Sequence, residues 1–179
     1  MSDQEITVGV TGGISAYKTA DLVSQLVQTG VHVNVVMTRA AQAFVGVTTF
    51  AALTGREVAL DLFDSPSQPL GAHIALAEKS ELLCIAPATA DFLAKTARGA
   101  ADDLLSTLYL AFSGPVVMAP AMNSTMWGHP AVQRNTQQLS DDGVHFVGPE
   151  AGWLSCRSRG PGRMADPAAI ATEIQRLLV

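Results

Sequence analysis

One stretch of the sequence decides the fold class: Glu5-Ile-Thr-Val-Gly-Val-Thr11, then Gly12-Gly-Ile-Ser15, then a longer run from Ala16 to Gln28. The first part is rich in β-branched residues, which is typical of a buried strand, and the glycine pair indicates a tight turn. Apolar residues then recur at helical spacing, at Leu22, Val23, Leu26 and Val27. Ser15 is a suitable cap for this helix, and Gly30 is a suitable end.

The same alternation continues along the chain. Further strands are predicted at His32 to Met37, Leu82 to Ala86, Val116 to Ala119 and Val144 to Val147, and a short helix around Arg39 to Phe44. Strands that alternate with helices predict a mainly parallel sheet with helices on both faces. We therefore expect one three-layer α/β domain over residues 1–179, Rossmann-like or flavodoxin-like in architecture.

Two irregular segments interrupt this rhythm, from Asp64 to Ala72 and from Gly148 to Pro167. Both contain several glycine and proline residues and are long for plain connections in a compact domain. Loops of this length are often binding loops or lids, so we expect them beside a ligand site.

The composition is that of a globular protein, with 48% hydrophobic and 15% charged residues. A formal charge of −5 gives no general attraction for nucleic acid or anionic membranes. Apolar runs fall short of the roughly 18 to 20 residues of a membrane helix, and the first residues are acidic where a signal peptide is basic. We expect a cytoplasmic protein without a disulfide between Cys84 and Cys156, and the four scattered histidines predict no metal site.

The turn from Thr11 to Ser15 is a candidate phosphate site. A helix amino terminus leaves backbone N–H groups unpaired and carries a partial positive charge. The turn lacks the full G-x-G-x-x-G pattern, and Thr38 stands where a dinucleotide-binding protein has an acidic residue. A mononucleotide such as FMN therefore fits better than NAD, although the same five residues are equally consistent with a plain strand-to-helix turn.

Two further loops carry small and hydroxyl residues after predicted strands, Ala86-Pro-Ala-Thr-Ala-Asp91 and Asp102-Asp-Leu-Leu-Ser106. Taken singly, Thr89 and Asp102 are good helix caps, which is the simpler interpretation of each loop. Three such loops at one edge of a parallel sheet nevertheless favour a shared mononucleotide cleft.

Three polar residues are candidates for chemistry. His73 begins a predicted helix, although a lone histidine is more often a surface or capping residue. Asn123 follows the strand Val116 to Ala119 and is also an ordinary turn residue. Cys156 lies among serine, arginine and glycine, which favours an exposed, usable thiol over a buried inert one.

The surroundings of these residues resemble the motifs of the flavin-dependent cysteine decarboxylases, and among them the phosphopantothenoylcysteine decarboxylases. The matching segments are Gly71-Ala-His-Ile74, Pro120-Ala-Met-Asn-Ser-Thr-Met-Trp127 and Gly160-Pro-Gly-Arg-Met164. The resemblance spans Val10 to Pro167. It implies FMN-dependent decarboxylation of 4′-phosphopantothenoylcysteine to 4′-phosphopantetheine in coenzyme A biosynthesis, through a thioaldehyde and an enethiolate.

The resemblance also implies roles for individual residues. His73 would be the base, Asn123 would hold the substrate carboxylate, and Cys156 would be the proton donor of the reductive step. FMN contacts are implied for Gly12, Gly13, Ile14, Ser15, Thr38, Phe44, Thr89, Ala90, Asp91, Ser106, Ala121 and Met126. Substrate contacts are implied for Asn123, Met122, Gly162, Arg163 and Met164.

The sequence departs from the family at two places. Arg157-Ser158 replaces a glycine and an acidic residue, and Glu78-Lys79 replaces a basic residue and tryptophan. Relatives form homotrimers or homododecamers that share active sites between subunits, which we expect here, together with a stand-alone decarboxylase. The alternatives are a peptidyl-cysteine decarboxylase of lantibiotic maturation, a flavin prenyltransferase and a non-catalytic regulatory flavoprotein subunit.

Overall fold

The computed structural model describes residues 4–63 and 71–179. Its centre is a five-stranded sheet in which every pairing is parallel, with strand order β2-β1-β3-β4-β5. The strands are β1 (Glu5–Val10), β2 (His32–Met37), β3 (Leu82–Ala88), β4 (Val116–Pro120) and β5 (His145–Phe146). The predicted α/β class with a parallel sheet is confirmed.

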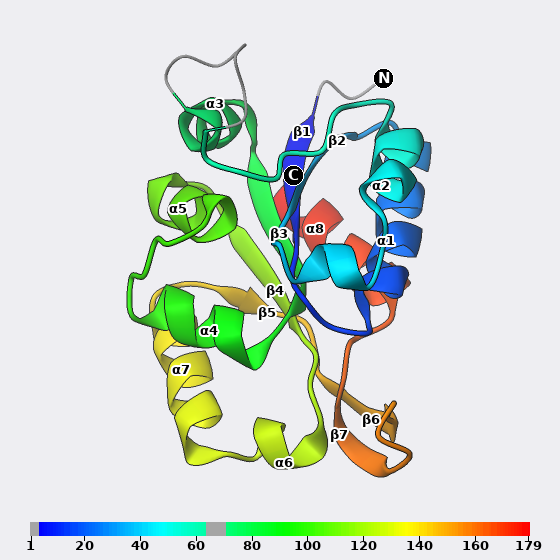
Figure 1. The fold of residues 1–179 in the computed structure, drawn as a ribbon, viewed down its shortest axis with the longest axis vertical. Helices are drawn as coiled ribbons and strands as arrows, with labels where there is room; N and C mark the ends of the chain where they lie inside the picture. Colours follow the sequence, from blue (N-terminus) through cyan, green and yellow to red (C-terminus); the bar gives the residue numbers. More distant parts are fainter. Residues whose placement is uncertain (1–3, 64–70) are drawn as a thin grey trace.

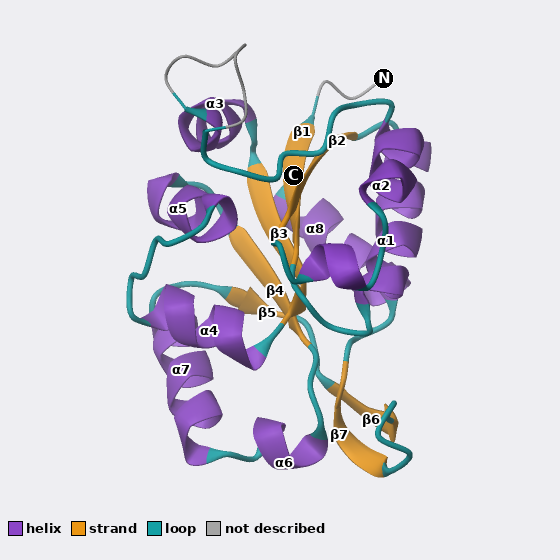
Figure 2. Ribbon diagram, in the orientation of Figure 1, coloured by secondary structure: helices purple, strands orange, loops and turns teal. Residues whose placement is uncertain are grey.

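Helices cover both faces of the sheet, as Figures 1 and 2 show. One face carries α1 (Ala16–Gln28), α2 (Val47–Thr54) and α8 (Pro167–Leu177). The other face carries α3 (Ala72–Lys79), α4 (Ala90–Ala97), α5 (Leu104–Ala111) and α7 (Pro130–Asp141). The two layers enclose separate apolar cores, so β3 and β4 are buried along their whole length. Central parallel strands covered on both faces have this character, which explains their nearly continuous apolar sequences.

Several predicted element boundaries need correction. The predicted strand Val144 to Val147 is reduced to the two residues of β5, an edge strand that pairs with β4 alone. The predicted helix around Arg39 to Phe44 is a single 3₁₀ turn, η1 (Ala41–Ala43). The first irregular segment lies outside the described residues, apart from Gly71 and the first residue of α3.

The second predicted irregular segment, from Gly148 to Pro167, contains regular structure. It forms an antiparallel hairpin of β6 (Glu150–Trp153) and β7 (Arg159–Arg163). Glycine and proline in the strands hid this pairing, because both residues are rare in ordinary strands. Figure 1 shows the hairpin projecting beyond the sheet, beside the short helix α6 (Ser124–Trp127).

The predicted helix boundaries at the first turn are partly right. Gly30 follows the end of α1 with φ of +87°, a conformation that glycine adopts without strain. Ser15 does stand immediately before α1, but its side chain makes no capping hydrogen bond. No helix in the described ranges is long and apolar enough to cross a membrane.

Candidate active site

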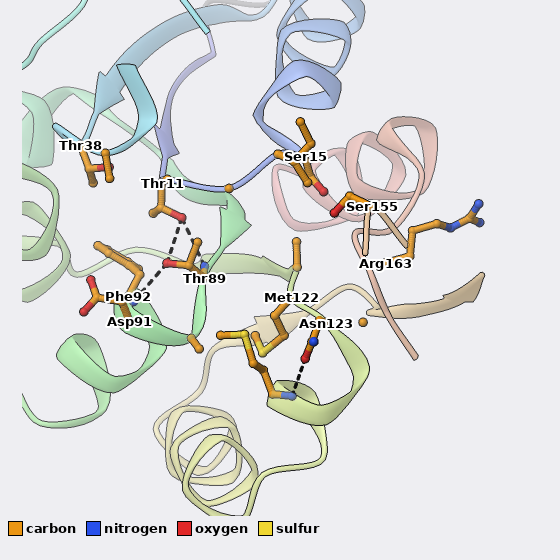
Figure 3. Close-up of a pocket in the computed structure, with 18 of the residues that line it drawn as sticks. Thr11, Ser15, Thr38, Thr89, Asp91, Phe92, Met122, Asn123, Ser155 and Arg163 are labelled. Atoms are coloured by element: carbon orange, nitrogen blue, oxygen red, sulfur yellow. Dashed lines mark hydrogen bonds between the residues drawn. The ribbon is translucent and has the colours of Figure 1, made fainter. Parts of the chain in front are cut away.

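A cavity of about 1490 Å³ opens at the carboxyl ends of the strands. Its wall is built from the segments that follow β1, β2, β3 and β4, together with the β6–β7 hairpin. Figure 3 shows the labelled residues around this space, contributed by separate elements. This edge is where open parallel α/β sheets bind ligands.

The turn after β1 lies unusually close to the segment after β2. A Cβ atom at Gly12 would overlap the Cβ atom of Ala40 and would lie 3.0 Å from its carbonyl carbon. Within the described chain, the backbone N–H groups of Ile14 and Ser15 have no intramolecular acceptor. Because α1 starts at Ala16, these groups sit at the positive end of a thirteen-residue helix.

Thr11 joins this turn to the one after β3. Its hydroxyl donates to the carbonyl of Pro87 at 2.5 Å and accepts from the N–H of Thr89 at 3.2 Å. Thr89 in turn caps α4, because its hydroxyl accepts from the N–H of Phe92 at 3.3 Å. The capping interpretation of Thr89 is therefore confirmed, and the residue also lines the cavity.

A cluster of charges lies on the same wall. The ammonium group of Lys95 is 2.9 Å from Asp102, 3.2 Å from Asp103 and 3.8 Å from Asp91. The hydrogen bond with Asp102 raises the pKa of Lys95, and the same bond lowers the pKa of Asp102. The cap of α5 is Asp103 and not Asp102 as the sequence suggested, because Asp103 forms a reciprocal capping box with Ser106.

Asn123 combines a structural role with an orientation toward the cavity. It is the cap of α6, and its Oδ1 accepts from the N–H of Met126 at 2.8 Å (Figure 3). This bond assigns the oxygen and the nitrogen of the amide, because only the oxygen can accept a hydrogen bond. The NH₂ group therefore remains as a donor for a ligand in the cavity, which Asn123 lines.

The hairpin supplies the remaining wall. Trp153, Ser155 and Cys156 line the cavity, and the Sγ of Cys156 is 3.1 Å from the Oγ of Ser158. At the base of the hairpin, Arg163 forms an ion pair of 2.5 Å with Glu150.

Most residues proposed from the sequence lie on the cavity wall. They are Gly12, Gly13, Ile14, Ser15, Thr38, Thr89, Ala90, Asp91, Ala121, Met122, Asn123, Met126, Cys156, Gly162 and Arg163.

Four proposed residues are not on this wall: His73, Phe44, Ser106 and Met164. Ser106 is buried in the capping box of α5, and Met164 is fully buried in the core, so neither faces the cavity. Phe44 is 47% exposed just beyond the 3₁₀ turn. His73 lies in the first turn of α3, which Figure 1 shows at the opposite end of the sheet from α6 and the hairpin.

The sequence-based site omitted a further group of wall residues. They are Thr11, Tyr17, Lys18, Arg39, Ala40, Phe92, Lys95, Asp102, Asp103, Trp153, Leu154 and Ser155. Lys18 lies one helical turn beyond Ile14, a spacing that could have revealed it. For Lys95 the sequence offered only the i, i+4 spacing from Asp91 on α4, because its nearer partners Asp102 and Asp103 come from a different loop.

Fold and cavity define an α/β protein whose ligand site lies at the carboxyl edge of a parallel sheet. The flavoprotein family model matches residues 1–179, and the chain belongs to this family. It is 44% identical over 167 residues to the "Coenzyme A biosynthesis bifunctional protein CoaBC" of Vibrio vulnificus (strain YJ016). That match covers 93% of this chain and 42% of the relative, so the chain spans less than half the length of this curated relative.

Two solved structures are similar over almost their whole length. The FMN-dependent cysteine decarboxylase SpaF has a TM-score of 0.85 and 37% identity, covering 99% of this chain and 98% of that one. A cysteine-to-serine mutant of PPC decarboxylase, complexed with pantothenoylaminoethenethiol, has a TM-score of 0.87 and 25% identity, covering 99% of both chains. The fold is therefore shared with proteins that carry these two descriptions.

Proposed function

We propose that residues 1–179 form one FMN-dependent decarboxylase domain that converts 4′-phosphopantothenoylcysteine to 4′-phosphopantetheine and CO₂ in coenzyme A biosynthesis. The observation that carries this proposal is the amide of Asn123. Its Oδ1 accepts from the N–H of Met126, so its NH₂ group is a neutral donor in the same cavity as the turn after β1. The relatives named for coenzyme A biosynthesis and for PPC decarboxylase support the choice of substrate.

The residues of the cavity fit FMN. No side chain fits at Gly12 against Ala40, so the turn would present the backbone N–H groups of Ile14 and Ser15 directly to a phosphate in the cavity. The hydroxyl groups of Ser15 and Thr38 lie on the same wall. A single phosphate suits this turn, and Thr38 offers no carboxylate for the ribose of a dinucleotide. When bound, FMN supplies a reversible acceptor for the hydride of the cysteinyl carbon next to sulfur.

Asn123 and Cys156 have separate roles in the reaction, one in binding the substrate carboxylate and the other in donating a proton. The NH₂ of Asn123 donates to the substrate carboxylate and orients it. A neutral amide stabilises the carboxylate anion less than a cation would, so it opposes loss of CO₂ less. Loss of CO₂ leaves an enethiolate. The exposed thiol of Cys156, brought by the hairpin to the opposite wall, donates the proton that completes the return to the saturated product.

His73 requires a second copy of the chain. Its helix lies away from the cavity of its own subunit, and its Nδ1 is buried without a hydrogen-bond partner among the described residues. In a homotrimer or homododecamer, α3 of one subunit would bring His73 to the cavity of its neighbour, where the imidazole acts as the base of the oxidative step.

The direct test is to purify the protein, identify its flavin and incubate it with 4′-phosphopantothenoylcysteine. We expect a yellow protein that releases FMN on denaturation, with CO₂ and 4′-phosphopantetheine as products. A colourless protein that fails to take up added FMN, or a flavoprotein that leaves this substrate unchanged, would contradict the proposal.

Mixed subunits test the shared site. His73→Asn alone should lose decarboxylation by roughly 10²- to 10⁴-fold while keeping FMN, and Cys156→Ser alone should fail to make the saturated product. Random mixing of the two variants should restore ordinary product at about a quarter of the sites if each histidine serves a neighbour in a symmetric oligomer. No restoration after verified subunit exchange would contradict a shared site.

A second candidate is decarboxylation of a cysteine at the end of a peptide. The 37% identity with SpaF, described as an FMN-dependent cysteine decarboxylase, favours keeping it. The same purified protein should be offered peptides that end in cysteine. Turnover of such peptides above that of 4′-phosphopantothenoylcysteine would favour this alternative while leaving the roles of Asn123 and FMN in place.

A further inference from the structure

Strand β7 carries two glycines on one face. Gly160 and Gly162 lie on the same side of the strand, because Cβ atoms there would meet Ser124 and Met122 respectively, and the register with β6 shifts beside Gly162. That side faces the loop of Asn123 and the start of α6, beside which Figure 1 places the hairpin. Glycine in a strand often marks a place where another backbone approaches closely.

At Gly162 the approach is between two backbones. Its carbonyl accepts from the N–H of Met122 at 2.9 Å. A Cβ atom at this position would overlap the carbonyl oxygen of Met122, and φ is +127°, a region that L-residues rarely enter. No side-chain rearrangement can relieve this contact, because the opposing atom belongs to the main chain next to Asn123.

At Gly160 the approach is to a side chain. A Cβ atom there would overlap the Oγ of Ser124 and would lie 3.2 Å from the Cβ of Ser124. The Oγ of Ser124 is buried and has no hydrogen-bond partner within the described residues. Its hydroxyl is therefore covered by the glycine strand without being paired to it, so this contact depends on close packing.

The other hydrogen bonds that hold the hairpin lie at its two ends. Glu150 holds its base through Arg163 and through the N–H of Asp166. At the tip, the bonds of Leu154 with Arg157 and Ser158 close the turn that carries Cys156 and connect only hairpin residues. The glycine face is thus the described contact between the middle of the hairpin and the Asn123 loop.

We propose that Gly160 and Gly162 are positioning residues that set the distance between Cys156 on the hairpin and Asn123 on the loop after β4. This inference rests on the proposed function for the chemical roles of those two side chains. The glycines act through backbone proximity, so the hairpin must lie against the Asn123 loop before the thiol can serve the group that the amide orients.

The test compares two glycine substitutions and one suppressor. Gly160→Ala should displace the hairpin, and added Ser124→Ala should partly restore its position, because the overlapping Oγ is removed and the 3.2 Å Cβ contact remains. Gly162→Ala should displace the hairpin as well, but added Ser124→Ala should not restore the position of the hairpin in that variant. Gly128→Ala is the matched control, because a Cβ there would meet nothing closer than 3.5 Å.

Product composition provides the functional readout. In air, where molecular oxygen reoxidises the reduced flavin, displacement should leave CO₂ release largely intact. Saturated product should fall by up to about 100-fold for a shift near 1 Å, so the enethiol accumulates. The suppressor should reverse this in the Gly160→Ala background alone. An unchanged product ratio in both glycine variants, with an active parent, would overturn the proposal.

Trypsin provides a readout that needs no substrate. Cleavage after Arg157 and Arg159 on the hairpin should be faster in both glycine variants, and slower again when Ser124→Ala is added to Gly160→Ala. FMN content and a thermal melt confirm that the rest of the chain is folded. Cleavage at the parental rate in both variants would overturn the proposed positioning role of Gly160 and Gly162, even if the protein proved to have another activity. A parent that decarboxylates nothing would contradict the proposed function alone.

Discussion

The two walls of the cavity are attached to the protein in different ways. The turn after β1 continues a strand that is buried from Ile6 onward. Thr11, only 2% exposed, bonds to Pro87 near the end of β3 and to Thr89 just after it. The β6–β7 hairpin lies outside the sheet, with Trp153 60% exposed and Cys156 exposed at its tip. The first wall therefore shares the stability of the core, whereas the second is held by a few surface contacts. Changes to the first should affect folding and flavin retention, and changes to the second should affect chemistry with little effect on the free energy of unfolding.

The largest effect is expected on the hairpin. Cys156→Ser should lower formation of saturated product by roughly 10²- to 10⁴-fold, because a serine hydroxyl is a much weaker acid than a thiol. CO₂ should still be released, and mass spectrometry should find the enethiol, which has two hydrogen atoms fewer than 4′-phosphopantetheine. The two electrons stay on the flavin until molecular oxygen reoxidises it. FMN content and the midpoint of urea unfolding should stay at the parental values. Ordinary product at the parental rate would show that Cys156 is not the donor.

A smaller but global effect is expected at the turn after β1. Gly12→Ala places a Cβ atom against Ala40, and overpacking of this kind costs about 1–3 kcal/mol of unfolding free energy. The variant should also lose FMN on gel filtration. Gly46→Ala is the control, because no atom lies within 4 Å of a Cβ at that position. If Gly12→Ala retained FMN and stability, the two walls would not differ as described.

Loss of the hydrogen bonds of Thr11 should lower the free energy of unfolding less than the overlap created by Gly12→Ala. Thr11→Val keeps the shape but leaves the Pro87 carbonyl and the Thr89 N–H without their partner, at a cost of about 1–3 kcal/mol, with the lower end expected. Urea unfolding measures this loss. Thr172→Val, on the exposed side of α8, should change the free energy of unfolding by less than about 0.5 kcal/mol. Equal losses of unfolding free energy in the two valine variants would contradict the assignment of Thr11 to the core.

The smallest effect is expected at the base of the hairpin. The hydrogen bond from Arg163 lowers the pKa of Glu150 below its ordinary 4.5. A lowered folded-state pKa stabilises the protein above pH 4.5, and that contribution is lost as the pH falls through the lowered value. For this partly exposed pair, Glu150→Gln should cost at most about 1 kcal/mol at pH 7. The difference from the parent should shrink in acid, and a difference that grows there would contradict the assignment.

The sequence predicted much of the first wall and little of how the second is held. Strand β1, the turn from Thr11 to Ser15 and helix α1 follow one another in the chain, so residue type and spacing suffice to predict them. The hairpin was predicted as an irregular loop, because Gly160 and Gly162 are poor strand residues in isolation. Their use becomes clear only when the backbone of Met122 lies against them.

By itself, the sequence determined the α/β alternation, the mononucleotide-type turn and the presence of Asn123 and Cys156 in distinctive motifs. Those features depend on residues that are near one another in the chain. The tertiary structure alone decided that Thr11 bonds to Thr89, that the glycine face of β7 meets the Asn123 loop, and that His73 lies away from the cavity of the same chain. These relations join segments tens of residues apart, and hydrophobic burial, which folds the layers onto the sheet, places them without a local sequence signal.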